Sequence, residues 1–367
     1  MLSQVLQQLQ PASPAAAPMQ GQCLGARVEC PSSAQQALQL LEEHHDAAIV
    51  LSADPAIALR EHLYAMADIR LQAPIVDLGA LPHDPATHSA LVEQLVGGLC
   101  QHGHTLLLLG AAQNLSNAVL RGLKARANNL SLCAISPGMG LDAAPHDALG
   151  GQLHDFCLMA HQSYYTSQQL VQSLRDRHFD LMRLGQIRAD HRTAEPTFRG
   201  SDAVSIDLRA VRAADCPSHT LPNGLHAEEA CQLAHYAGSA DRVAAVVIHG
   251  LSPSPPDQVH NLVAQIAWHI MEGIALRRHE HPATAPTRFK KFIVSTPMAS
   301  DLIFYRSNLA ATWWMEMHPA HLAEPVLIPC SQADYSQACQ QELPERWLRN
   351  FSRLQQNNSL PEQPNTM

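Results

Sequence analysis

The sequence predicts an α/β fold built on a mostly parallel, doubly wound sheet of about eight strands. Its apolar residues gather in short continuous runs without alternation, a pattern typical of parallel strands that are buried on both faces. Segments with helical periodicity separate these runs, and a strand–helix–strand order favours right-handed crossovers within one sheet. With 367 residues and 46% hydrophobic content, the chain is long and apolar enough to bury such a core.

The eight expected strands are short apolar runs in the first 250 residues. They occupy residues 47–53, 73–79, 104–111, 130–136, 155–161, 178–185, 202–208 and 242–250. Two helical segments are marked most clearly. Residues 257–278 place apolar side chains on one stripe behind Asp257, a suitable N-cap, and residues 227–238 end in Gly238, a suitable C-cap.

Both ends of the chain differ in pattern from this region. The first residues are rich in Gln, Ala and Pro, and we expect them to be loose or to form a short helix. Residues 289–307 have the pattern of a hairpin, and residues 342–356 have that of a closing helix. The expected organisation is a loose N-terminal segment (1–22), an α/β domain (23–288), a C-terminal extension packed on that domain (289–355) and a disordered tail (356–367).

Composition excludes several classes of protein. The formal charge is −9 with histidine neutral and there is no basic tract, so nucleic acid is not an expected partner. No run of about 18 apolar residues occurs that would span a membrane, and the N-terminus lacks the pattern of a secretory signal. The nine cysteines form no C-x-x-C pair. Free thiols in a reducing cytoplasm are therefore expected.

Ligands of doubly wound sheets bind at the carboxyl ends of the strands. Applied to the expected strands, this rule selects four places where a functional site would lie. They are Gln113–Asn114, Ser136–Gly140, Asp207–Arg209 and His249–Leu251.

Several segments between residues 40 and 350 are similar to the arginase (ureohydrolase) superfamily, most closely to its bacterial formimidoylglutamase-like branch. They read HQSYYTSQQL, HFDLMRLGQIR, SDAVSIDLRAVRAADCPSHTLPNGLHAEEACQLAHYAG, QVHNLVAQIAWHIMEGI, WWMEM and QELPERW. The resemblance implies a three-layer α/β/α fold. It also implies two Mn²⁺ ions that bridge a water, which attacks a guanidinium or formimino carbon.

The metal-binding motifs of that family are degenerate in this chain. The motif Gly-Gly-Asp-His-Ser corresponds to Gly110–Asn114, where Gln113 replaces the ligand histidine. Asp-Ala-His-x-Asp corresponds to Ser136–Gly140, which contains none of its three ligands. Ser-x-Asp-x-Asp-x-x-Asp-Pro keeps Asp207 but has Arg209 in place of the second ligand. One ligand of six remains, so the resemblance implies the fold without its manganese site.

Other family positions also depart from the pattern. Asp215 corresponds to an acid of the third motif that is not a ligand, and Gly250 or His249 stands where the family has a substrate-binding glutamate. The glycine-rich N-terminal loop is shortened to residues 52–62.

We expect Arg209 to neutralise Asp207 with paired hydrogen bonds, at the place where a metal would otherwise bind. The alternative is that Arg209 points into an open pocket, where it would hold an anionic ligand such as a carboxylate. Arg209 follows Asp207 by two residues, so both side chains are expected on the same face of a strand. Asp207 is then an ion-pair partner rather than a catalytic acid, and His249 is a satisfied histidine at the sheet edge rather than a base. The expected vestigial pocket comprises Gln113, Asn114, Ser136, Asp207, Arg209 and His249.

Other polar groups have a spacing that metal sites use. His269 and Glu272 lie three residues apart on an expected helix, but without evident partners we interpret them as a solvent-facing pair. The histidine-rich stretches 44–46 and 279–281 are interpreted as solvated, with weak zinc or nickel binding as the alternative. The two tryptophans in 311–317 either pack the C-terminal extension or anchor an interface.

These observations favour a metal-free, catalytically inactive ureohydrolase-fold protein that serves a binding or scaffold role. No cofactor is expected, and a protein partner or a second copy of the chain is. One alternative is an active hydrolase of linear amidines that uses ligands outside the three motifs. Another is a small-molecule sensor that keeps the old pocket.

Overall fold

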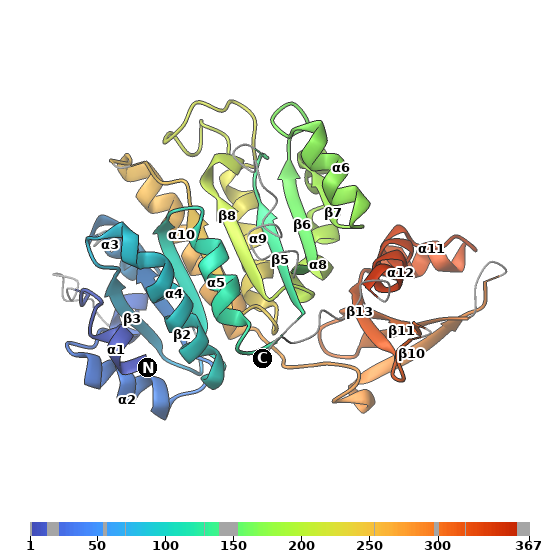
Figure 1. Ribbon diagram of the computed structural model, residues 1–367, viewed down its shortest axis with the longest axis horizontal. Helices are drawn as coiled ribbons and strands as arrows, with labels where there is room; N and C mark the ends of the chain where they lie inside the picture. Colours follow the sequence, from blue (N-terminus) through green and yellow to red (C-terminus); the bar gives the residue numbers. More distant parts are fainter. Residues whose placement is uncertain are drawn as a thin grey trace, which may run out of the picture. The chain divides into compact units, whose positions relative to one another are not determined.

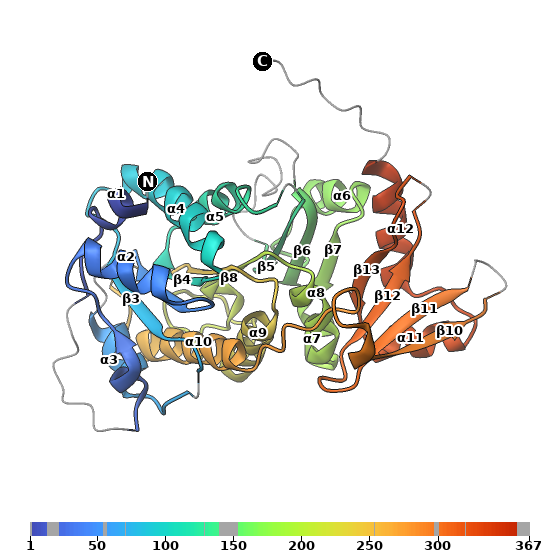
Figure 2. The ribbon, with the colours of Figure 1, turned by 90° about the horizontal axis from the view of Figure 1, so that it is seen from below.

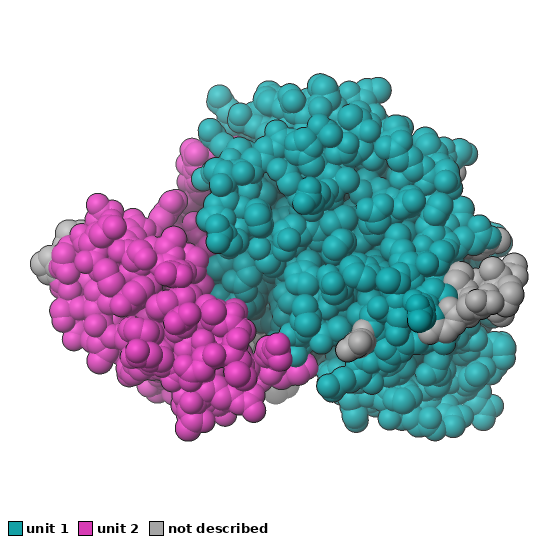
Figure 3. Space-filling view, turned by 180° about the vertical axis from the view of Figure 1, so that it is seen from behind, with its two compact units in different colours: residues 1–170, 181–277 teal, residues 171–180, 278–367 magenta. Residues whose placement is uncertain are grey.

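The structure is a computed structural model that contains two sheets (Figure 1). It describes residues 2–12, 22–53, 57–69, 71–127, 129–138, 153–252, 254–296, 301–319 and 321–357. Contacts divide the chain into two compact units, one of residues 1–170 with 181–277 and one of residues 171–180 with 278–367 (Figure 3).

The central sheet has nine strands in the order β1-β3-β2-β4-β9-β8-β5-β6-β7. They are β1 (Val28–Glu29), β2 (Ala48–Ser52), β3 (Ile75–Ala80), β4 (Thr105–Ala111), β5 (Leu130–Ile135), β6 (Leu153–His161), β7 (Asp180–Arg183), β8 (Ala203–Asp207) and β9 (Ala245–His249). The pairs from β1 through β6 in this order are all parallel. All eight expected strands are confirmed. The ninth, β1, is only two residues long and gives no apolar run.

Helices cover both faces of this sheet, as the three-layer prediction requires. The helices of this part of the chain are α1 (Leu2–Leu6), α2 (Ala34–Glu43), α3 (Ile57–Ala65), α4 (Pro85–Leu99), α5 (Leu115–Leu123), α6 (Gln168–Asp176), α7 (Leu184–Ala189), α8 (Glu195–Arg199), α9 (Ala227–Ser239) and α10 (Asp257–Ala275). Helices α4 and α5 lie on one face, and α3, α9 and α10 on the other (Figure 2). Both layers bury apolar stripes against strands that are buried along their length.

Two expected helix caps are wrong. The N-cap of α10 is Pro256, and Asp257 is the first helical residue, with its carboxylate 2.8 Å from Nε2 of His62. The C-cap of α9 is Ala240, and Gly238 lies inside the helix. A Cβ on Gly238 would lie 2.0 Å from the carbonyl oxygen of Ile270 on α10. Glycine is therefore needed there for close helix packing rather than for a turn.

The N-terminal residues, which we expected to be loose or to form a short helix, include the short helix α1, whose Val5 and Leu6 are buried. Gln10 forms a bridge with Ala80 at the end of β3. Residues 13–21 lie outside the described residues. No helix in the described part of the chain has the length and apolar character needed to cross a membrane.

The second unit contains a four-stranded antiparallel sheet in the order β10-β11-β12-β13. Besides residues 171–176 of α6, its elements are β10 (Phe289–Val294), β11 (Leu302–Ser307), β12 (Trp313–Met317), β13 (Val326–Cys330), α11 (Gln332–Cys339) and α12 (Glu345–Asn357). Strands β10 and β11 are the expected hairpin, and α12 is the expected closing helix. Most of the tail expected to be disordered, from 358 onward, lies outside the described residues.

The two tryptophans of β12 are both buried. Trp313 belongs to the apolar core of this unit, where its ring stacks on Tyr335 with 4.7 Å between ring centroids, whereas Trp314 packs edge-on against His281 with 4.6 Å between ring centroids. The expectation that residues 279–281 are solvated is wrong for Glu280, which is buried and accepts a 2.7 Å hydrogen bond from Ser307 Oγ.

Candidate functional site

The carboxyl ends of four neighbouring strands line up along one edge of the central sheet. In register, Ala111 of β4 lies beside His249 of β9, and His249 lies beside Asp207 of β8. Ile135, the last residue of β5, lies beside Ile206 of β8. The four segments selected from the sequence therefore all begin at the same edge of the central sheet, where these strands end.

Asp207 lies at the centre of this edge and is completely buried. Arg209 Nη2 donates to Oδ2 of Asp207 at 2.7 Å, and Arg209 Nε lies 3.0 Å from Oδ1 and 3.1 Å from Oδ2. The backbone N–H of Arg209 also donates to Oδ1 at 3.0 Å. Hydrogen bonding to this carboxylate is the main cause that raises the pKa of Arg209. One arginine thus occupies both oxygens of the carboxylate.

The contact between Asp207 and Arg209 arises from a turn. Strand β8 ends at Asp207, and residues Leu208–Ala210 form a short 3-10 helix that Asp207 caps with its side chain. Our reason for expecting the pair, that both residues share one face of a strand, is wrong. The turn brings the guanidinium of Arg209 back onto the carboxylate of Asp207, two residues earlier.

Two further residues close around the carboxylate of Asp207. The Oγ of Ser136, which is buried just after β5, donates to Oδ2 at 3.4 Å. Gly250 has a φ of 88°, and a Cβ added there would lie 2.9 Å from Oδ1 of Asp207. The backbone after β9 therefore passes so close to Asp207 that a side chain at position 250 would have to displace it.

His249 is also buried, and its imidazole forms a hydrogen bond with a serine on the neighbouring strand β8. Its Nε2 lies 3.0 Å from Oγ of Ser205, and that hydroxyl lies 3.0 Å from Oγ of Ser116 on α5. Burial lowers the pKa of His249. A buried imidazole with a lowered pKa stays neutral near pH 7, so it adds no charge to the edge.

Gln113 and Asn114 follow β4 and lead into α5. Gln113 is half-buried, whereas Asn114 is exposed at the N-cap position and makes no capping hydrogen bond with its side chain. In the second motif, the backbone N–H of Gly138 donates to Ser136 Oγ at 3.2 Å, and residues 139 and 140 lie outside the described residues.

Asp215, the non-ligand acid of the third motif, stabilises the loop before α9. Arg212 donates to it through Nε and Nη2, each at 2.9 Å, and Ala227 N donates at 3.0 Å. These hydrogen bonds, chiefly those from Arg212, lower the pKa of Asp215. Its role is to join the loop to the first turn of α9.

The donor groups of the edge, among the residues that the structure describes, do not fit a pair of Mn²⁺ ions. Such ions need several carboxylates or imidazoles with free lone pairs. The described edge offers the amide of Gln113, the hydroxyl of Ser136 and an imidazole already bonded to a serine. Its single carboxylate is enclosed by a guanidinium. No catalytic step through metal ions can be built from this set.

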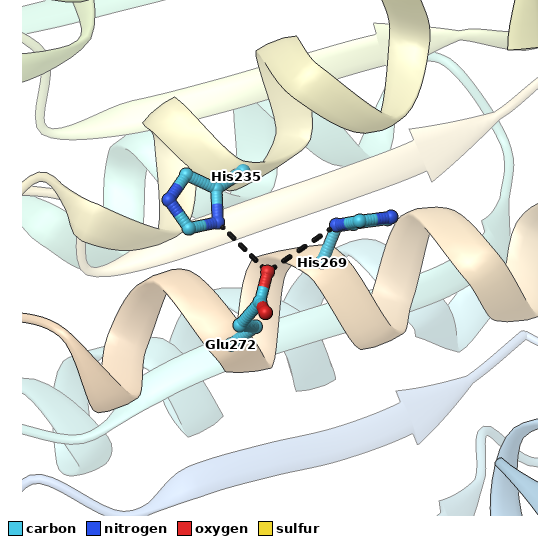
Figure 4. Close-up of side chains that lie close together, drawn as sticks. All are labelled: His235, His269 and Glu272. Atoms are coloured by element: carbon cyan, nitrogen blue, oxygen red, sulfur yellow. Dashed lines mark hydrogen bonds and ion pairs between the residues drawn. The ribbon is translucent and has the colours of Figure 1, made fainter. Parts of the chain in front are cut away.

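A different cluster in the described part of the chain has the geometry of an ion site. His235 on α9 and His269 and Glu272 on α10 place their ligand atoms within 4.8 Å of one another (Figure 4). The interpretation of His269 and Glu272 as a pair without partners is wrong, because His235 joins them. Sequence reasoning could not find His235, since only the packing of α9 on α10 brings it there.

Comparisons with known proteins point to one fold. No family model matches the chain, and no curated protein sequence matches it. Among solved structures, formiminoglutamase from Trypanosoma cruzi, solved with Mn²⁺, shares 19% identity with a TM-score of 0.57, over 65% of this chain and 98% of that one. Formimidoylglutamase from Bacillus subtilis shares 13% identity with a TM-score of 0.55, over 64% and 89%.

Arginase from Bacillus subtilis also matches, with 13% identity and a TM-score of 0.50, over 62% of this chain and 98% of that one. At such identities the similarity establishes the fold and leaves the activity open. The chain has the arginase fold, and the predicted relationship to the arginase and ureohydrolase structures is confirmed at that level.

Proposed function

We propose that this arginase-fold chain is catalytically inactive at its sheet edge and serves a binding or scaffold role. The observation that carries the proposal is the enclosure of Asp207, the single family ligand that the motifs retain. Its two oxygens accept four hydrogen bonds from Arg209 and one from Ser136. A divalent ion at this carboxylate would have to displace the arginine.

Electrostatics oppose an ion that binds while Arg209 stays in place. A guanidinium and a divalent ion 4 Å apart repel by about 8 kcal/mol at an effective dielectric constant of about 20. The side chain of Arg209 is 29% exposed, so solvent screens part of this repulsion. If Arg209 moved away instead, it would lose its bonds to a carboxylate that has no solvent exposure. The carboxylate of Asp207 alone would have to offset one of these costs for each arrangement of the ions.

We infer the binding role because a chain that keeps the fold without catalytic activity can still bind a partner. The proposed partner is another protein or a second copy of the chain, and light scattering of the purified protein separates the two. A monomer that captures no partner but is stabilised by acidic metabolites would favour a small-molecule sensor instead.

The competing proposal is an active hydrolase whose metal ligands lie outside the aligned motifs. In the sequence, residues 139–152 contain Asp142, His146 and Asp147, and this segment lies outside the described residues. These three residue types are ligands that Mn²⁺ accepts. A decisive experiment must therefore measure metal content and activity directly.

The test uses metal-stripped protein incubated with Mn²⁺ and then desalted. We expect no stoichiometric manganese by elemental analysis. We also expect no hydrolysis of formimidoylglutamate, agmatine or arginine, with a manganese-loaded formimidoylglutamase as the positive control. Near-stoichiometric manganese together with hydrolysis that a chelator stops would overturn the proposal. If that activity disappeared in Asp142→Asn or His146→Ala but persisted in Asp207→Asn, the competing ligands would be identified.

A further inference from the structure

We propose that His235, His269 and Glu272 form a zinc site between helices α9 and α10, separate from the sheet edge. The Nδ1 atoms of both histidines point to the same carboxylate oxygen (Figure 4). His235 Nδ1 lies 3.1 Å from Glu272 Oε2, and His269 Nδ1 lies 3.4 Å from that atom. All three ligand atoms lie within 4.8 Å of one another.

These separations match what tetrahedral zinc needs. With metal–ligand distances of about 2.0–2.2 Å, neighbouring ligand atoms around a tetrahedral ion lie about 3.3–3.5 Å apart. The two histidine–glutamate separations are already in or near this range. Only the two imidazoles must approach each other, which small χ2 rotations on two helices can achieve.

Helix packing holds the ligands in this arrangement. A Cβ on Gly273, the residue after Glu272, would lie 2.4 Å from the carbonyl oxygen of His235. The backbones of α9 and α10 are therefore in close contact beside the ligands. Ligands on two regular helices in close contact lose little entropy when an ion binds, because the scaffold already fixes their positions.

The imidazole ring of His269 packs against the indole ring of the preceding residue. Trp268 packs edge-on against it with 5.1 Å between ring centroids. The indole Nε1–H of Trp268 in turn donates to the carbonyl oxygen of Ala67 at 2.8 Å. This contact orients the imidazole without using either of its nitrogens, so Nδ1 remains available for a ligand.

The residue types select the ion. Two imidazoles and one carboxylate suit Zn²⁺, whereas Mn²⁺ has the lowest affinity of the divalent first-row metals for such a site. The side chains of His235, His269 and Glu272 are 23%, 34% and 37% exposed, so an ion and a water in the fourth position can enter from solvent.

The site is remote from Asp207. Helix α10 begins after β9, and Glu272 lies 15 residues beyond its first residue, Asp257. At a rise of 1.5 Å per residue, that is about 22 Å along the helix. Zinc at this site and manganese at the sheet edge are therefore independent questions that separate variants can answer.

The experiment is a titration of metal-stripped protein with Zn²⁺ by calorimetry at neutral pH, followed by Co²⁺ with optical detection of tetrahedral coordination. We expect one tight equivalent per chain and a rise in melting temperature with zinc. The variants His235→Ala, His269→Ala and Glu272→Gln should each weaken that equivalent by more than about 100-fold, because loss of a supporting residue alone costs about 10–100-fold.

The controls separate this site from the other histidines, because the two at the site are among the 22 of the chain. His260→Ala changes a histidine on the same helix outside the cluster and should leave the tight equivalent unchanged, as should Asp207→Asn. Zinc binding that persists in all three cluster variants would identify an adventitious ion at other histidines. That result, or the lack of a tight equivalent in the wild-type protein, would overturn the proposal.

Discussion

The guanidinium of Arg209 lies against the carboxylate of Asp207, with Nη2 2.7 Å from Oδ2 and Nε 3.0 Å from Oδ1. The carboxylate is completely buried, and the arginine side chain is only partly so. The pair therefore places a permanent cation on the carboxylate of Asp207 at this edge of the described sheet. We expect the stability of this edge to depend on that contact, and our proposal extends the same dependence to metal affinity.

Replacing Arg209 with Ala will destabilise the protein by about 3 kcal/mol, because it leaves a buried carboxylate without its charged partner. This is the lower end of the usual range, since Arg209 is partly exposed. Chemical denaturation measures the change. Arg209→Lys should lose less, because it keeps the charge but not the paired geometry. An unchanged free energy of unfolding in Arg209→Ala would contradict a structural role for the pair.

The variant Arg209→Asp recreates the carboxylate pair of the family motif, and we expect it to restore neither manganese binding nor hydrolysis. Two like charges would lie side by side in a buried place, and no imidazole ligands would surround them. Elemental analysis after manganese incubation checks the first expectation. Stoichiometric manganese in this variant would show that Arg209 alone had blocked an otherwise competent site.

Gly250→Ala is expected to cost about 1–3 kcal/mol, because the backbone has a positive φ and the new methyl would meet Oδ1 of Asp207. The matched control is Gly185→Ala in α7, where a Cβ has nothing within 4 Å. That change should be neutral or stabilise the protein by up to about 1 kcal/mol. Equal effects of the two changes would show that the contact above Asp207 is not tight.

Stability will fall as the pH decreases below about 6.5, and His104 will contribute to that fall. Burial lowers the pKa of His104, whose Nδ1 accepts from Ala47 N at 3.2 Å and whose Nε2 lies 2.9 Å from the Leu41 carbonyl oxygen. A proton on Nδ1 would oppose the Ala47 N–H. At pH values between the ordinary pKa of histidine and the lowered pKa of His104, the unfolded chain therefore binds a proton that the folded chain does not bind. Protonation in this range favours the unfolded state.

Urea denaturation between pH 7.5 and 5 measures this effect. His104→Asn should reduce the slope of unfolding free energy against pH by up to about 1.4 kcal/mol per pH unit, which is the contribution of one proton. His321→Asn, at an exposed position, is the control and should keep the wild-type slope. Identical slopes in both variants would exclude His104 as a contributor.

The sheet could be predicted from the sequence because each buried strand is a continuous apolar run. All eight runs became strands, whereas β1, with two half-buried residues, has no such run and was missed. Local signals for helix ends were less reliable. Gly238 has the composition of a C-cap but serves the contact of α9 with α10, which no local pattern reveals.

The sequence by itself determined the fold class, the degenerate motifs and the presence of Arg209 near Asp207, since these depend on residue type and short spacing. Tertiary structure alone decided that a turn closes Arg209 onto Asp207 and that Gly250 passes against the same carboxylate. It also decided that His235 meets His269 and Glu272, although 34 residues separate His235 from His269. The physical reason is that hydrophobic patterning fixes which face of an element is buried. The contacts among polar side chains depend on how two packed elements meet, and their residues lie far apart in the chain.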